Sequence, residues 1–214
     1  MPAAVVPWRM SRKRLTREES REQTRQRLLD AGAAVIAKKG LSATSVEDIA
    51  AHAGYTRGAF YSNFKSKSDL FIDLLKNDHQ SIQLDLQQLL DADLSDEDLQ
   101  RQLTQFYSQC YRDHTSYVLW AEARLYAVRD SKFRQRLNVL CLEKRDVIAY
   151  FITQFCERMK RPLPAPAPDL ALAMMALIDG TLYFNISMPN EMTDAGVETA
   201  LGTIFHATFF GSRG

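Results

Sequence analysis

The 214-residue chain has few of the residues that cross-link or interrupt a fold: three cysteines, nine glycines and seven prolines. An odd cysteine count without a CxxC pair argues against a disulfide framework. Cys110, Cys141 and Cys156 each fall in an apolar helical pattern, which is typical of small buried side chains. A redox-sensing thiol is the alternative interpretation. The four histidines lack metal-ligand spacing, so we expect no metal and no cofactor.

The chain also lacks an unbroken apolar run long enough to cross a membrane, which takes about 18 residues or more. The nearest approach, residues 170–186, contains Asp179, Gly180 and Asn185. Residues 1–9 are too short and too broken by proline to hold the apolar core of a signal peptide. Met10 precedes a basic SRKR segment and is a candidate for the true start, which would make residues 1–9 an extension. We therefore expect a cytoplasmic protein without a membrane partner.

Signatures of catalysis are missing as well. The sequence shows no nucleophile paired with a base, no pair of carboxylates with catalytic spacing and no glycine-rich loop for a phosphate. We predict that the protein is not an enzyme.

The net charge of +1 conceals an uneven distribution. Residues 1–67 contain 13 Lys and Arg against 6 Asp and Glu, a net charge of +7. Residues 68–214 contain 14 against 20, a net charge of −6. A basic segment attracts phosphate, and an acidic remainder avoids it. The asymmetry predicts a nucleic-acid-binding N-terminal part and a second part with another task.

Apolar residues recur at helical spacing along almost the whole chain, and sustained period-2 alternation is absent. The pattern predicts an all-α fold of about nine helices, at residues 17–39, 46–53, 57–64, 67–90, 96–113, 116–129, 132–159, 169–187 and 194–210. Four prolines in residues 161–168 break the chain between the seventh and the eighth helix.

The first two helices have clear start and stop signals. Thr16 and Glu19 form a capping box before the first helix, and Gly40 is placed to end it. A second capping box is predicted at Thr44–Glu47, and Gly54 ends the helix that follows. The next helix begins after only a few residues, which is the helix-turn-helix arrangement.

The third predicted helix separates apolar from polar residues. Phe60 and Phe64 share one face and are expected to pack inward, while Ala59 keeps the outer face slim enough for the major groove. Arg57 can pair with guanine, and polar neighbours can contact phosphates. The residues predicted to contact DNA are Thr44, Ser45, Tyr55, Thr56, Arg57, Ala59, Tyr61, Ser62, Asn63 and Lys67. The alternative is an ordinary helical hairpin with a solvated basic tail.

The segment TSVEDIAAHAGYTRGAFYSNFKSKSDLF, residues 44–71, resembles the DNA-binding signature of the TetR family of bacterial transcription regulators. The resemblance covers about residues 17–71. Two positions depart from it: Asn63 stands where the family often has histidine, and Tyr55 where a small or polar residue is common. Both departures lie at the expected DNA surface and bear on which operator is read.

The resemblance implies a basic arm at residues 1–16, a three-helix helix-turn-helix domain at residues 17–66, and a helical effector-binding and dimerisation domain at residues 67–214. Small and apolar residues of the last two helices fit a dimer interface: Ala173, Ala176, Gly180, Leu201, Ile204, Phe205 and Phe209. Packing within one chain is the alternative.

The helix predicted at residues 116–129 is apolar nearly all round, yet it contains Glu122 and Arg124. A buried charge needs a partner, so we expect these residues either to line a pocket or to form structural salt bridges. The candidate pocket residues are Phe106, Cys110, Tyr117, Trp120, Glu122, Arg124, Tyr126 and Met175.

The sequence thus predicts a one-component transcriptional regulator, a repressor that binds a palindromic operator in double-stranded DNA as a homodimer. A small apolar or aromatic effector would release it. The alternative is a structural DNA-binding protein on the same fold, which acts in chromosome organisation or as a platform for partner proteins, without an effector.

Overall fold

The computed structural model describes residues 16–95, 97–99, 101–103, 105–106 and 114–210. Most of the expected basic arm and Cys110 lie outside these residues. The described part is helical and contains no strand. Its helices are α1 (Arg17–Lys39), α2 (Val46–His52), α3 (Arg57–Tyr61), α4 (Lys67–Asp91), α6 (His114–Arg129), α7 (Ser131–Arg158), α8 (Ala167–Ser187) and α9 (Asp194–Phe210). Residues 97–99, 101–103 and 105–106 are helical where a further helix is expected.

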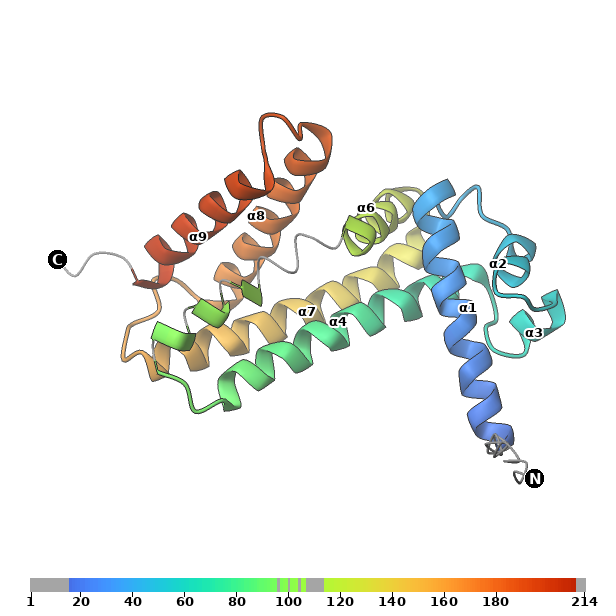
Figure 1. The fold of residues 1–214 in the computed structure, drawn as a ribbon, viewed down its shortest axis with the longest axis horizontal. Coiled ribbons are helices and arrows are strands. Elements are labelled where there is room, and N and C mark those ends of the chain that lie inside the picture. Colours follow the sequence, from blue (N-terminus) through green and yellow to red (C-terminus); the bar gives the residue numbers. More distant parts are fainter. Residues whose placement is uncertain (1–15, 96, 100, 104, 107–113, 211–214) are drawn as a thin grey trace, which may run out of the picture.

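The two longest helices, α4 and α7, run side by side in the same direction along the long axis of the molecule (Figure 1). The short helices α2 and α3 lie with α1 at one end, while α8 and α9 form an antiparallel pair at the other end. Helix α6 contacts α1, α4, α7 and α8. The all-α prediction is confirmed.

The ends of α1 follow the sequence signals. Thr16 Oγ1 accepts a hydrogen bond from the Glu19 amide, and Glu19 Oε2 accepts one from the Thr16 amide, which completes the capping box. Gly40 ends the helix with φ of 79°, in the region that favours glycine. Both features match the expectation.

Helix α2 begins at Val46 as predicted, but its capping box lies one residue later than predicted. Ser45, and not Thr44, caps the helix, and its capping-box partner is Asp48, and not Glu47. The reason is that the Thr44 hydroxyl donates to the Gly40 carbonyl oxygen at 2.8 Å and is thereby committed to the preceding loop. Hydrogen bonds from Lys39 and from the Ser45 amide hold the pKa of Asp48 well below its usual range.

Helix α3 is shorter than predicted and ends at Tyr61 instead of near Phe64. The side chains of Ser62 and Asn63 donate to the Ala59 carbonyl oxygen, at 2.8 Å and 2.9 Å. They replace the backbone donors that a longer helix would supply.

The first hydrophobic core crosses the boundary predicted at residues 66 and 67. It joins side chains from both parts of the chain: Leu28, Leu29 and Ile36 of α1, Ile49 of α2, Phe60 of α3, Leu70 and Phe71 of α4, Trp120 and Ala123 of α6, and Phe133 and Leu137 of α7. Phe71 and Phe133 stack with ring centroids 5.8 Å apart. The three-helix region α1–α3 therefore shares one core with the helices that follow it.

A second core fills the space between the later halves of α4 and α7, the 97–106 segment and the first half of α8. A smaller third cluster joins α8 to α9 through Leu182, Val197 and Leu201. Ser95 accepts a hydrogen bond from the Asp98 amide at the start of the 97–106 segment.

Helix α8 is the one described helix that is long and apolar enough to cross a membrane, by length and composition alone. Only 28% of its most apolar window is buried. Apolar length by itself is weak evidence for a span, because core helices of soluble proteins and signal sequences pass the same test.

The loop of residues 40–44, which joins α1 to α2, is held from two sides by side chains that are distant in sequence. Glu122 Oε1 accepts a hydrogen bond from the Leu41 amide at 2.7 Å. Lys67 Nζ donates to the carbonyl oxygens of Leu41 and Thr44, both at 2.7 Å. The Glu122 carboxylate thus binds an N–H group of the loop, and the Lys67 ammonium group binds its carbonyl groups. Together these contacts fix the direction in which α2 starts.

We predict that Glu122→Ala destabilises the protein by about 1–3 kcal/mol, because it leaves the amide of the fully buried Leu41 without its acceptor. Equilibrium unfolding in urea measures this change. Glu122→Gln is the matched control, since its amide oxygen can still accept the hydrogen bond. Equal stabilities of wild type and Glu122→Ala would show that the hydrogen bond does not stabilise the loop.

Candidate nucleic-acid interface

Helix α3 is anchored on one side and exposed on the other. Phe60 and Phe64 are buried in the first core, with their ring centroids 5.6 Å apart. Thr56 caps the helix by accepting a hydrogen bond from the Ala59 amide. Arg57 and Tyr61 extend from the opposite side, and 48% of Tyr61 is exposed. This is the division between an anchoring face and a reading face that the sequence predicts.

The guanidinium group of Arg57 has two neighbours that orient it. Its Nη1 lies 3.0 Å from Glu47 Oε1 on α2, and its Cζ lies 5.4 Å from the centroid of the Tyr61 ring. Hydrogen bonding to Tyr61, followed by the negative charge of Glu47, raises the pKa of Arg57. The group therefore stays charged and is held on the exposed side of α3.

Four of the predicted contact residues have structural tasks in the free protein. Thr44 is 1% exposed and bonds within its loop, so a phosphate at that point would meet backbone amides rather than its hydroxyl. Ser45 caps α2, and Lys67 binds the 40–44 loop. Tyr55 is half-buried against the first core, and its hydroxyl lies 3.5 Å from Thr24 Oγ1 on α1.

The end of α3 combines structural and surface roles. Ser62 is exposed, although its hydroxyl donates to Ala59. Asn63 uses its Nδ2 for Ala59 and Ser62, while its buried Oδ1 finds no hydrogen-bond partner among the described residues. A hollow beside this point is lined by Arg17, Glu18, Arg21 and Ser62, which brings the start of α1 next to the end of α3.

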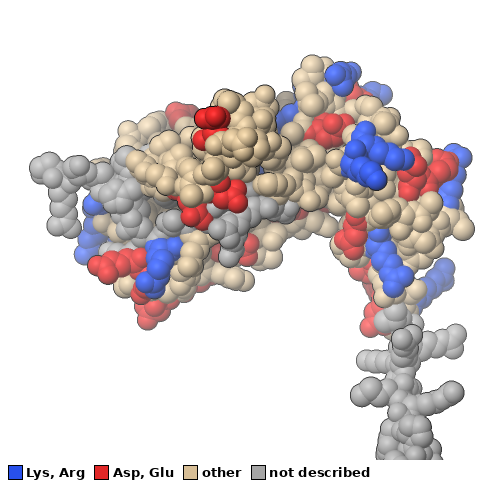
Figure 2. Space-filling model, turned by 45° about the horizontal axis from the view of Figure 1, so that its top comes forward, with Lys and Arg blue, Asp and Glu red and all other residues tan. Residues whose placement is uncertain are grey.

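Two residues that the sequence analysis did not assign to the DNA-contacting set shape the same surface. Glu47 contacts Arg57 across the turn. Arg25 on α1 forms an ion pair with Asp73 on α4 at 2.9 Å and lies over the Phe64 ring at 4.6 Å. Neither pairing follows a local sequence period, so only the fold reveals it. Figure 2 shows basic and acidic side chains interspersed on the end of the molecule that holds α1–α3.

The polar groups of the candidate pocket residues on α6 bind different neighbours, although the Arg124 guanidinium also lies over the Trp120 ring at 6.0 Å. Trp120 donates from Nε1 to Asp78 Oδ2 on α4 at 2.6 Å. Glu122 turns toward the 40–44 loop, and Arg124 pairs with Asp179 on α8 at 2.6 Å. Glu122 and Arg124 thus both have structural partners, of which only that of Arg124 is a salt bridge.

The other candidates are dispersed as well. The Tyr126 ring packs edge-on against Phe133 in the first core, with centroids 5.0 Å apart. Tyr117 lies at the third cluster, and Met175 lies at the second core. Phe106 is the described candidate that lines a hollow.

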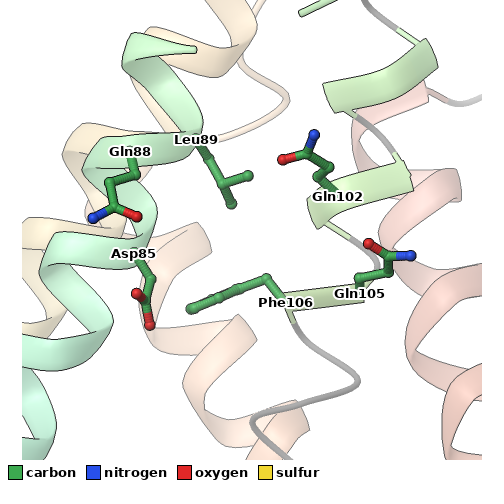
Figure 3. Close-up of a pocket in the computed structure, with 6 residues that line it drawn as sticks. All are labelled: Asp85, Gln88, Leu89, Gln102, Gln105 and Phe106. Carbon is green, nitrogen blue, oxygen red and sulfur yellow. The ribbon is translucent and has the colours of Figure 1, made fainter.

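That hollow lies between α4 and the 97–106 segment and has a volume of about 260 Å³. Its lining consists of Asp85, Gln88, Leu89, Gln102, Gln105 and Phe106. In Figure 3 the Phe106 side chain reaches across toward Asp85, and Gln102 faces Leu89. The walls are mainly amides and a carboxylate, so the site is more polar than the aromatic pocket that the sequence predicts.

The candidate dimer residues divide into exposed and internal positions. Ala173 and Ala176 are exposed on α8, and an added Cβ at Gly180 would meet open space. Leu201 is buried against Leu182 in the third cluster. Ile204 is 44% exposed, whereas the side chains of Phe205 and Phe209 lie outside what the structure describes.

Both described cysteines are sheltered. Burial raises the pKa of the Cys141 and Cys156 thiols, which disfavours the reactive thiolate. Among the described residues, no group of His, Cys, Asp and Glu could hold a metal ion.

Comparison with known proteins finds relatives of both the sequence and the fold. Residues 28–74 match the model of the bacterial regulatory proteins of the tetR family. The chain is 48% identical over 61 residues to the HTH-type transcriptional regulator AcrR of Shigella flexneri. This match spans 28% of the present chain and 28% of AcrR, so about a quarter of the length of that relative is covered.

Two solved structures extend the likeness of the fold to most of the chain. A TetR-family transcriptional regulator from Rhodococcus sp. has a TM-score of 0.74 at 21% identity and covers 88% of this chain and 99% of its own. The regulator FadR from Bacillus subtilis, solved with stearoyl-CoA, has a TM-score of 0.69 at 19% identity and the same coverage. The sequence match and the common fold lead to one conclusion: residues 28–74 carry the sequence of the tetR family of bacterial regulatory proteins, and the chain shares the fold of regulators of that family.

Proposed function

We propose that the protein is a one-component transcriptional regulator that binds double-stranded DNA in the cytoplasm through α3. The observation that carries the proposal is the division of α3 into a buried side, Phe60 and Phe64, and an exposed side with Arg57 and Tyr61. A helix of this kind fits the major groove, where arginine can bind guanine O6 and N7 in a bidentate manner. Ala59 between them leaves room for a thymine methyl group.

The proposed functional unit is a homodimer formed through α8 and α9. Helix α8 has an exposed apolar stripe that includes Leu172, Ala173, Ala176, Tyr183 and Phe184. A contiguous exposed apolar surface of this kind is typical of an interface between proteins. A dimer with twofold symmetry binds two half-sites about 34–36 Å apart, which corresponds to a palindromic operator.

We further propose that the protein is a repressor which a small molecule releases from DNA by binding among the helices from α4 onward. FadR, which shares the fold, was solved with stearoyl-CoA. Release requires that the effector bind the form with the wrong half-site separation more tightly than the DNA-bound form. The polar hollow at Asp85 and Gln102 is a starting point for such a ligand.

The alternative remains a structural DNA-binding protein without an effector. The observation in its favour is the small size of that hollow, about 260 Å³, where ligand pockets usually measure roughly 300–1,000 Å³. A thermal-shift screen with metabolites and drugs separates the two: a compound that raises Tm and weakens DNA binding supports the regulator.

The first test is selection from a library of randomised 30-base-pair duplexes, followed by anisotropy titration of the selected duplex. We predict that Arg57→Ala weakens binding to the selected duplex by about 1–3 kcal/mol, or about 5- to 150-fold, because a bidentate base contact is lost. The loss should be largest for duplexes that keep the guanine of the half-site.

Arg101→Ala is the matched control for Arg57→Ala. Arg101 is similarly exposed, at 68% against 65% for Arg57, and is also paired with an acid, but it lies outside α1–α3. Equal losses for the two variants would show that α3 does not read the sequence. A wild-type protein that enriches no duplex would refute the proposed function itself.

We predict that Phe184→Lys converts the dimer to a monomer and weakens operator binding, because a charge would then face the apolar stripe of the partner. Sedimentation velocity measures the association state. Phe184 is 47% exposed in the single chain, so Tm of the monomer should change little. Tyr150→Lys, at a 55% exposed aromatic of α7, is the control. A Phe184→Lys protein that remains a dimer would place the interface elsewhere.

A further inference from the structure

An acidic side chain stands at the centre of the surface proposed to meet DNA. Glu47 belongs to the first turn of α2, and its Oε1 lies 3.0 Å from Arg57 Nη1 on α3. Both side chains are more than half exposed, at 57% and 65%. Exposed ion pairs contribute little to stability, and an anion beside phosphates opposes binding. The ion pair between Glu47 and Arg57 therefore requires an explanation other than stability or affinity.

The pair limits the positions that the Arg57 guanidinium can take. Glu47 holds Nη1 from one side, and the Tyr61 ring lies beneath the group at 5.4 Å. A guanidinium has five N–H donors in a rigid plane, so one contact at Nη1 leaves enough donors for a bidentate contact. Arg57 is held in place without losing its capacity to bind a base.

The charge of Glu47 also separates the two kinds of acceptor that DNA offers to Arg57. A phosphate oxygen carries negative charge, and it would come to lie beside the Glu47 carboxylate when it binds Arg57. Guanine O6 and N7 are neutral acceptors, so the same carboxylate repels them far less. Glu47 thereby makes a contact to the backbone less favourable than a contact to a base edge.

We infer that Glu47 is a positioning residue that determines sequence specificity, because it reserves Arg57 for guanine and opposes binding through phosphate contacts alone. The inference rests on the proposed function. A purely structural role, in which the carboxylate interacts with the N-terminal dipole of α2, would alter stability and leave specificity unchanged.

The test compares wild type with Glu47→Gln on the selected duplex and on the unselected random library. We expect Glu47→Gln to bind the random library about three- to tenfold more tightly, because Arg57 can then take a phosphate contact. The slope of log affinity against log salt for the library should steepen by about 0.9, the value for one additional phosphate contact. Affinity for the selected duplex should change less, so the ratio of the two affinities falls.

Two further variants isolate the effect. Glu143→Gln removes the charge of an exposed α7 residue and controls for the change in net charge. Glu47→Gln in the Arg57→Ala background should leave the affinity ratio unaltered, since the group that Glu47 restrains is gone. Unfolding curves of all variants report separately on any loss of stability.

An unchanged ratio of specific to random binding in Glu47→Gln, with the wild type still selective, would overturn the inference and leave the proposed function standing. The same applies to an equal change in Glu143→Gln. A wild type that selects no sequence would instead refute the proposed function, and the role of Glu47 with it.

Discussion

The orientation of α2 and of α3, the helix proposed to read DNA, depends on the five residues that join α1 to α2. Glu122 of α6 binds the Leu41 amide of this loop, and Lys67 of α4 binds its carbonyl groups. The hydroxyl of Thr44 closes the loop on Gly40. Helix α2 begins directly after this loop and supports α3 through the first core. A shift of α6 relative to α1 would therefore strain the hydrogen bonds that set the direction of α2, and would change the position of Arg57 on α3.

Helices and their ends could be predicted well from the sequence, because capping residues and apolar periodicity are local. Gly40 and the Thr16–Glu19 box show this most clearly. The capping box of α2 was misplaced by one residue, since two overlapping boxes are possible and the competing hydrogen bond from Thr44 to Gly40 decides between them. The contact between Glu122 and Leu41 spans 81 residues, and no local pattern reveals it.

In the candidate site as well, local features could be predicted from the sequence and contacts between distant residues could not. The apolar and polar sides of α3 follow from helical geometry, so the exposure of Arg57 and Tyr61 was predictable. The partner of Arg57 was not, because Glu47 approaches it only after the turn has folded. The aromatic pocket expected on α6 was harder still: residue type indicates burial, but whether Trp120 faces a cavity or a carboxylate depends on the helix beside it.

The continuous first core limits how freely this DNA-binding region can be exchanged between regulators. Phe71 and Phe133, which follow residue 66 in the sequence, stack on each other in this core. Leu28 and Ile49, which precede residue 66, share the same core with Trp120. A chimera joined at residue 66 would place a foreign helix-turn-helix against a complementary apolar surface that has not evolved with it. Engineering a new operator preference is therefore better done by substitution on the outer side of α3 than by grafting a whole domain.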